Sequence, residues 1–140
     1  MIDSDLVQRL RSLSNEVWRT VMRWPGFARQ TLGSQLVDCL DSIGANLVEG
    51  DGRATEPDAI RFFVISRGSL REAQFWLLLA SDRDLIPHDR FLAHKEELRQ
   101  LSLMLNALIA YRQQSRTQKG VREELVPYDV DGDGGLEPRA

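Results

Sequence analysis

The sequence predicts an all-α protein, an antiparallel up-down-up-down four-helix bundle at residues 1–115 followed by a flexible, disordered acidic tail at residues 116–140. Apolar residues recur at spacings of three and four in four segments of about 20 to 27 residues, which is the period of a helix. The links between these segments are short, and short links favour antiparallel neighbouring helices. No stretch of any length alternates polar and apolar residues as a strand does.

The first helix is expected at residues 5–24, with Ser4 as its N-cap. Pro25 and Gly26 stop it, because proline cannot continue a helix and glycine suits a turn. Its apolar stripe consists of Leu6, Leu10, Leu13, Val17, Val21 and Trp24.

The second helix is expected to begin at Phe27 or Thr31 and to end at Glu49. Gly50 and Gly52 follow it, and both tolerate the positive φ that often ends a helix. Its apolar stripe consists of Leu32, Leu36, Leu40, Ile43 and Leu47.

The third helix is expected to run from Thr55, which can cap the free amides, to about Ala80. It is apolar on more than one side, so we expect burial on several sides, either at the centre of the bundle or against another subunit. Gly68 and Ser69 lie in its middle, where the glycine costs about 1 kcal/mol of helix propensity. We expect this glycine to permit the close approach of another helix.

The fourth helix is expected at residues 88–114, and the pattern is lost beyond Ser115. Residues 117–140 are polar and acidic, which predicts a mobile tail. The face of the fourth helix that follows the helical period carries Phe91, Lys95, Leu98, Leu101, Leu105, Leu108 and Arg112.

Charge is divided unevenly between the bundle and the tail. Residues 1–122 carry 17 Lys and Arg against 15 Asp and Glu, a net charge of +2. Residues 123–140 carry one Arg against six acids, a net charge of −5, which gives the −3 of the whole chain. A tail of this charge can hide a slightly basic surface.

The single cysteine, Cys39, excludes an intrachain disulfide. Its apolar neighbours on a predicted helix favour a small buried side chain over a reactive thiol. The N-terminus has no basic and apolar leader, and the longest apolar run, Phe75 to Ala80, is far too short to span a membrane. We therefore expect a cytoplasmic protein that does not contact a membrane.

The segment from Ser34 to Ala80 carries the motifs of a known family. Three of them resemble the SQL…SI..NI.EG pattern of bacterial four-helix bundle proteins first noted in intervening sequences of 23S ribosomal RNA genes: Ser34-Gln35-Leu36, Ser42-Ile43 and Asn46-Leu47-Val48-Glu49-Gly50. Two more resemble the F…GSLxE stretch of that family: Phe62-Phe63 and Gly68-Ser69-Leu70-Arg71-Glu72. The order and spacing match, and the resemblance extends from Leu6 to Arg112.

The resemblance implies a left-handed four-helix bundle that assembles into a ring, typically a homopentamer. The family includes the accessory protein of diversity-generating retroelements, which uses such a ring to bind nucleic acid and a reverse transcriptase. The partners implied for this chain are therefore other copies of itself, RNA or DNA, and a reverse transcriptase. The positions of the family motifs, with a structural role, are Ser34, Gln35, Asn46, Glu49, Gly50, Gly68, Ser69 and Glu72.

The chain departs from the family directly after Leu36. Family members often have a basic pair there, whereas this chain has Val37 and Asp38. An acid at that place weakens a local field for phosphate and counts against nucleic-acid binding by this part of the chain.

Arginine outnumbers lysine by 16 to 2 in this chain. Arginine suits bidentate phosphate contacts and interface ion pairs, and a solvated face is the alternative interpretation of the same residues. In a ring, a weak patch repeated in every subunit gains avidity without new contacts. The candidate nucleic-acid-binding residues are Arg9, Arg19, Arg23, Arg29, Arg53, Arg61 and Arg71.

Asn46, Glu49 and Glu72 have two interpretations. In the first they form a polar site for a partner or ligand. In the second, Asn46 and Glu49 bond the backbone of the turn that follows them, and Glu72 pairs with Arg67 or Arg71, since buried polar groups need partners.

The sequence contains no recognisable catalytic or metal-binding constellation. His88 and His94 have no ligand at metal spacing, and neither an E-x-x-H pair nor a G-x-x-x-x-G-K motif is present. A D-x-D-x-D-G stretch at residues 129–134 begins like a calcium loop, but its twelfth position is Ala140 in place of glutamate, so a solvated acidic tail is the alternative. We expect no enzyme, no cofactor and no metal.

Three hypotheses for the function follow. The first is a non-enzymatic, ring-forming scaffold whose composite surface binds nucleic acid or a nucleic-acid enzyme such as a reverse transcriptase. The second is a protein–protein adaptor that binds no nucleic acid and uses the acidic tail as its docking segment. The third is an enzyme or ligand carrier with a cavity in the bundle core, against which the apolar stripes predict a packed core.

Overall fold

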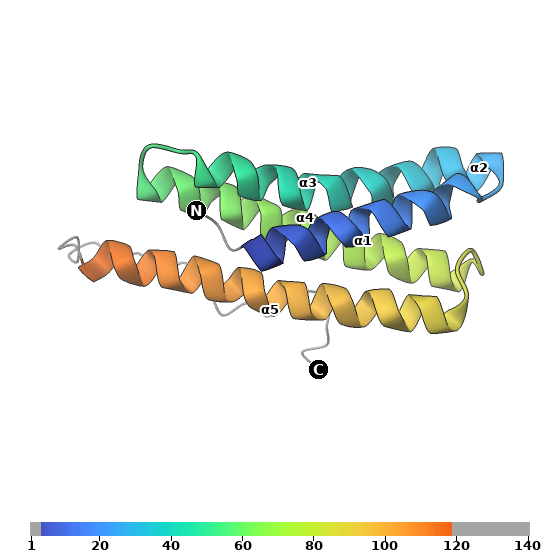
Figure 1. Ribbon diagram of the computed structural model, residues 1–140. Helices are drawn as coiled ribbons and strands as arrows, with labels where there is room; N and C mark the ends of the chain where they lie inside the picture. The colour runs from blue at the N-terminus through green and yellow to red at the C-terminus, as the bar shows by residue number, and fades with distance from the viewer. Residues whose placement is uncertain (1–3, 119–140) are drawn as a thin grey trace.

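The computed structural model describes residues 4–118, with the side chains of residues 5–114. This range is helical apart from its turns and contains no strand, which confirms the all-α prediction. Four long helices lie side by side and alternate in direction (Figure 1): α1 Ser4–Met22, α3 Ser34–Asp51, α4 Glu56–Asp82 and α5 His88–Gln118. Residues 116–118, which the sequence assigns to the flexible tail, continue α5, so the tail prediction is wrong there. The rest of the predicted tail, with its calcium-like stretch, lies outside the described residues.

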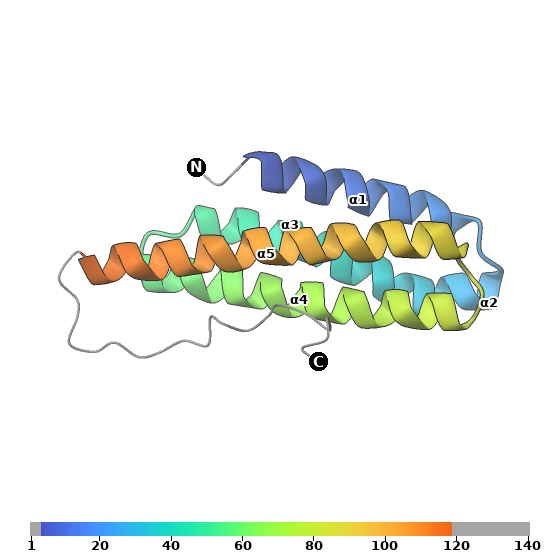
Figure 2. The same cartoon turned by 90° about the horizontal axis from the view of Figure 1, so that it is seen from below.

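The helices are arranged so that α1 and α4 lie diagonally across the bundle. Helix α1 packs against α3 and α5, and α4 packs against the same two helices from the other side. With 19 residues against 31, α1 covers only part of α5, alongside its N-terminal portion (Figure 2). None of the described helices has the length and hydropathy that crossing a bilayer requires.

The core is formed by the predicted apolar stripes. All six stripe residues of the first predicted helix are buried, although the last of them, Trp24, lies beyond the end of α1 at Met22. All five stripe residues of the second predicted helix are buried too. On α5 the predicted face is wrong at two positions: Lys95 is exposed while its neighbour His94 is buried, and Leu108 is half-buried while its neighbour Ile109 is fully buried. The largest side chains with less than 2% exposure include Phe63, Leu36, Ile43, Ile60, Leu101 and Leu105.

The start of the second predicted helix is more complex than expected. A short helix α2 at Gly26–Ala28 leads into one π-helical turn, η1 at Arg29–Gly33, before α3 begins. A Cβ on Gly33 would lie 2.5 Å from Cγ1 of Val21, so α1 approaches this turn more closely than any other residue allows. The periodicity of apolar residues does not reveal a π turn, because the extra residue is absorbed before α3 begins.

Gly50, in the last turn of α3, has a different role from the one predicted. Gly50 and Gly52 do not adopt positive φ, and the only described non-glycine residue with positive φ is Asp84, at 57°. A Cβ on Gly50 would lie 2.8 Å from Cε1 of Phe63, 2.9 Å from Cβ of Phe62 and 3.0 Å from the carbonyl oxygen of Ala59. Gly50 is therefore required by the close approach of α3 to α4.

The expectation for Gly68 is wrong within this chain. No atom lies within 4 Å of the position that a Cβ on Gly68 would occupy, so no helix of the bundle approaches it. The close contact in this region is made by its neighbour, because the Ser69 hydroxyl lies 3.0 Å from the Ser42 hydroxyl on α3. Gly68 instead faces outward from α4.

The N-cap of α4 is the predicted one. The side-chain oxygen of Thr55 accepts a hydrogen bond from the backbone amide of Asp58.

Candidate nucleic-acid interface

Helices α1 and α5 leave an open groove along their seam. Its wider part holds ≈ 250 Å³ and lies between the end of α1 and the start of α5. Two of its floor residues are apolar, Ile86 and Pro87. The remaining lining residues are polar or charged: Glu16, Arg19, Thr20, Arg23 and Arg90. We refer to these seven residues as the α1–α5 groove.

Two arginines of the groove have no hydrogen-bond or ion-pair partner among the described side chains. Arg19 and Arg23 are four residues apart, so the helical period places them on the same side of α1. Both are exposed, and neither forms a hydrogen bond or an ion pair with another residue in the range 5–114. Arginine without a carboxylate partner presents its full set of donors to an external anion.

Arg90 completes the groove from the opposite side. It comes from the first turn of α5 and forms an ion pair with Glu16 of α1 across the seam. Sequence reasoning missed this residue, since 74 positions separate it from its partner and no motif surrounds it. The groove thus holds three guanidinium groups against one carboxylate, a combination that attracts phosphate groups.

A second hollow of ≈ 200 Å³ continues the seam beyond the Arg90–Glu16 pair. Its lining includes His94, which is only 3% exposed and forms no hydrogen bond with any described residue. Burial, and next the nearby charge of Arg90, lower the pKa of His94 below its usual value. A neutral imidazole therefore lies beneath the charged rim of the seam.

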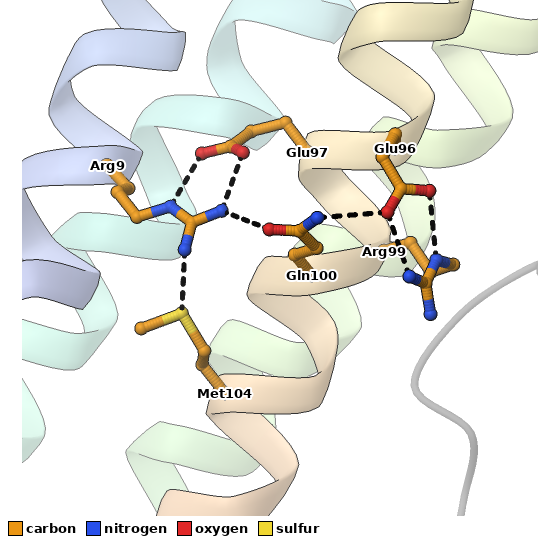
Figure 3. A network of polar contacts seen from close by, with 6 residues as sticks. All are labelled: Arg9, Glu96, Glu97, Arg99, Gln100 and Met104. Atoms are coloured by element: carbon orange, nitrogen blue, oxygen red, sulfur yellow. Dashed lines mark hydrogen bonds and ion pairs between the residues drawn. The ribbon is translucent and has the colours of Figure 1, made fainter.

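Arg9 lines the second hollow, and its guanidinium contacts three side chains of α5 (Figure 3). Its guanidinium donates to both carboxylate oxygens of Glu97, at 3.0 and 2.7 Å, and to the side-chain oxygen of Gln100 at 2.7 Å. Its third nitrogen lies 3.6 Å from Sδ of Met104. The hydrogen bonds to Glu97 raise the pKa of Arg9. This candidate therefore joins α1 to α5, and the carboxylate of Glu97 compensates its charge.

Arg53 and Arg61 are also engaged, at the opposite end of the bundle. Both donate to Asp58, at 2.8 Å and 3.0 Å, and both lie over the ring of Phe62, within 4.7 Å of its centroid. Arg53 further pairs with Glu49 at 3.0 Å. Hydrogen bonds from the two arginines hold the pKa of Asp58 below its usual value. Their charge is largely compensated locally.

The remaining two candidates differ from each other. Arg29 donates to the backbone carbonyl of Trp24 at 3.2 Å, which fixes it beside the turn after α1. Arg71 is exposed on α4 and forms no contact with a partner among the described side chains. The structure therefore brings together only Arg19 and Arg23 of the seven candidates in one groove.

The motif residues form polar contacts within α3, through Asn46, and between α3 and α4, through Ser69 and Glu72. Asn46 donates to the hydroxyl and carbonyl oxygens of Ser42, both at 2.9 Å, rather than to the turn after α3. Glu72 accepts a hydrogen bond from Cys39 at 3.2 Å, in place of the expected pairing with an arginine. Ser34 and Gln35 are exposed on α3. These contacts fix the register of α3 against α4 and form no enclosed site.

Two further observations bear on chemistry. Burial, followed by its bond to Glu72, raises the pKa of Cys39 to about 11, so its thiol stays protonated at neutral pH. Among the described residues no group of three or more His, Cys, Asp and Glu side chains is placed to bind a metal ion.

Comparison with known proteins identifies one family. The sequence model of the family described as 23S rRNA-intervening sequence protein matches residues 3–107. A crystal structure of a protein of unknown function from the S23 ribosomal protein family of Bacteroides thetaiotaomicron VPI-5482 is similar, with a TM-score of 0.68. Its sequence is 16% identical over 74% of this chain and 97% of that chain, so the likeness concerns the fold. No curated protein matches this chain in sequence.

Proposed function

The chain belongs to the 23S rRNA-intervening sequence protein family, and from this premise we propose that it is a non-enzymatic, homo-oligomeric scaffold that binds nucleic acid in the α1–α5 groove. A homopentamer is the assembly that the family resemblance favours. A nucleic-acid enzyme such as a reverse transcriptase is the kind of protein that such a scaffold would serve.

One observation carries the proposal for nucleic acid. Arg19 and Arg23 have no acidic partner among the described residues, and Arg90 faces them across a groove of ≈ 250 Å³. Phosphate contacts by arginine supply most of the affinity in sequence-independent nucleic-acid binding. A single groove offers few contacts, and repetition around an oligomer multiplies them.

The outward surface of α4 supports self-association. Ile65, Phe75 and Leu78 are 41%, 44% and 44% exposed, although each is a large apolar side chain. Gly68 lies between them in sequence, with open space above it. A helix surface of this kind suits the close approach of a helix from another copy, because a glycine lets the backbones come together.

Fluorescence anisotropy tests the proposal for nucleic acid. Labelled RNA and DNA oligonucleotides are titrated with the full chain over a series of salt concentrations. We expect the logarithm of the binding constant to fall linearly with the logarithm of the salt concentration. The double variant Arg19→Glu, Arg23→Glu should abolish binding at physiological salt, and each single variant should lower the salt slope by about one.

Arg71→Glu is the matched control, because it makes the same charge change at an exposed, unpaired arginine on a different helix. Its solution mass is measured as well, because Arg71 is three residues beyond Gly68 on the outward surface of α4. At the wild-type mass it should retain most of the affinity. Equal losses in Arg19→Glu and Arg71→Glu would contradict binding at the groove, and the absence of any salt-sensitive binding would contradict nucleic-acid binding altogether.

Light scattering coupled to size exclusion tests the assembly. A pentamer has a mass of about 80 kDa, five times the 16.0 kDa of one chain. Phe75→Glu on α4 should lower this mass, because a buried unpaired charge opposes an apolar contact. A wild-type mass of 16.0 kDa would contradict the scaffold.

A protein–protein adaptor is the second candidate, favoured by the same exposed apolar residues of α4. It predicts no affinity for nucleic acid. Deleting residues 123–140 separates the candidates, because this segment carries six acids. If the segment competes with nucleic acid, its deletion strengthens oligonucleotide binding, and if it docks a protein partner, its deletion abolishes that complex.

A further inference from the structure

Large apolar side chains are exposed on α1 and directly after it, outside the seven residues that line the α1–α5 groove. Trp18 and Met22, both on α1, are 51% and 50% exposed, and Phe27, in the short helix α2, is 81% exposed. Trp18 forms no ring contact and no hydrogen bond with any residue in the described part of the chain. Exposed aromatic residues of this size are costly to leave in water and indicate a contact surface.

These residues form a row parallel to the arginines. Trp18 and Met22 are four positions apart on α1, as are Arg19 and Arg23, so each pair lies along one ridge of the helix. The two ridges are adjacent, because Arg19 and Met22 are three positions apart on the helix, whereas Trp18 and Arg19 point about 100° apart around its axis. Members of each pair are separated by about 6 Å along the helix axis.

We propose that the ligand of this surface is single-stranded nucleic acid, with its phosphates on the Arg19–Arg23 ridge and a base stacked on Trp18. The inference rests on the proposed function and adds the strandedness of its ligand. Unpaired positive charges on a helix ridge adjacent to an exposed aromatic ring are a combination by which proteins bind single strands without reading their sequence.

Charge and geometry favour this ligand over the alternatives. In a duplex both faces of every internal base are covered by its neighbours, so the indole of Trp18 could contact only an end, whereas an unpaired base offers its face. The ridge beside Trp18 and Met22 carries two unpaired positive charges, which suits a polyanion and opposes a second copy of the same ridge.

The experiment compares a labelled 20-nucleotide single strand with the duplex of the same sequence, by anisotropy at one salt concentration. We expect the wild-type chain to prefer the single strand. Trp18→Ala should weaken single-strand binding about tenfold or more, which corresponds to the usual binding free energy of one base stacked on an aromatic ring. It should change duplex binding less than about twofold. Trp18→Phe should retain most of the affinity, because it keeps an aromatic ring.

Tyr111→Ala is the matched control. Tyr111 is 66% exposed and lies on α5, 21 residues beyond Arg90 or about 30 Å along the helix. The Tyr111→Ala variant should bind the single strand with the affinity of the wild type. Indole fluorescence adds a readout that needs no variant: the single strand should quench the emission of Trp18, and the effect should be missing in Trp18→Phe.

The outcomes separate this inference from the proposed function. The first outcome is that the wild type binds both oligonucleotides equally, that Trp18→Ala does not weaken this binding, and that the Arg19→Glu, Arg23→Glu variant loses it. This result would overturn the stacking role of Trp18 and would leave the groove as a nucleic-acid site. A lower solution mass of Trp18→Ala would make Trp18 a subunit contact and overturn the inference. No binding of either oligonucleotide would overturn both.

Discussion

The guanidinium of Arg112, near the end of α5, binds the carboxylate of Glu56 in the first turn of α4, with N–O distances of 2.6 to 3.0 Å. The two side chains are 21% and 23% exposed, and the guanidinium lies 5.2 Å from the ring centroid of Phe63. Hydrogen bonding to Glu56 raises the pKa of Arg112. The pair joins two helices at one end of the bundle.

Glu56→Gln should therefore destabilise the bundle. The substitution leaves a partly buried guanidinium without its anion, and we expect the free energy of unfolding to fall by about 1–3 kcal/mol, measured by denaturant titration. Glu96→Gln is the control, because Glu96 pairs with Arg99 on the exposed surface of α5 and its loss should not be measurable. Similar losses in both variants would contradict a special role for the Arg112 pair.

Gly50→Ala should also destabilise the fold, through a steric effect. The added Cβ would lie 2.8 Å from Phe63 and 3.0 Å from the carbonyl oxygen of Ala59, and the backbone oxygen cannot move without shifting α4. We expect a loss of roughly 1–3 kcal/mol in the free energy of unfolding, as for other overpacked sites. An unchanged denaturation midpoint would show that α3 and α4 can separate at little cost.

Gly68→Ala should have the opposite effect on the free energy of unfolding and stabilise the fold. Nothing occupies the space around Gly68, so alanine should stabilise the isolated subunit by about 0.5–1 kcal/mol through helix propensity and lower unfolded-state entropy. Thermal unfolding of the dilute protein measures this. If another copy packs on Gly68, the same variant should weaken assembly at high concentration, which light scattering detects.

Cys39 should be unreactive in the folded protein. Burial, and then the bond to Glu72, raise the pKa of its thiol to about 11 from the reference value of 9.0. At pH 8 a disulfide reagent should label Cys39 slowly in the native chain and rapidly in denaturant. Because the folded pKa is raised, stability relative to Cys39→Ala is fully present below pH 9 and is lost between about pH 9 and pH 11. Rapid native labelling would contradict the burial.

His94 should make the bundle less stable in mild acid. Burial lowers its pKa, so below about pH 6.5 the unfolded chain binds a proton that the folded chain does not. The charged groups that line the hollow with it are Arg9, Glu16, Arg90 and Glu97. We expect stability to decline as pH falls through 6.5, and His94→Gln to remove this part of the decline. His88→Gln, at an exposed position, is the control.

Sequence reasoning located the helices and the core well, because both depend on local periodicity. The stripe from Leu6 to Trp24 is buried throughout, and Thr55 caps α4 as predicted. The π turn at Arg29–Gly33 and the burial of His94 were missed, since each depends on how a neighbouring helix packs. The prediction for Gly50 was wrong for the same reason. Both a positive φ and the close approach of another helix favour glycine, and only the packing of α3 on α4 shows that the second applies.

The sequence by itself determined an all-helical bundle, its family and an excess of arginine over lysine, because these are properties of composition, spacing and motif. Only the tertiary structure decided which arginines are available. Arg9 and Arg19 look alike in the sequence, yet Arg9 meets Glu97, 88 residues away, whereas Arg19 meets no carboxylate among the described residues. Pairing across helices depends on their register and rotation, which the burial of apolar stripes fixes only when the whole bundle packs.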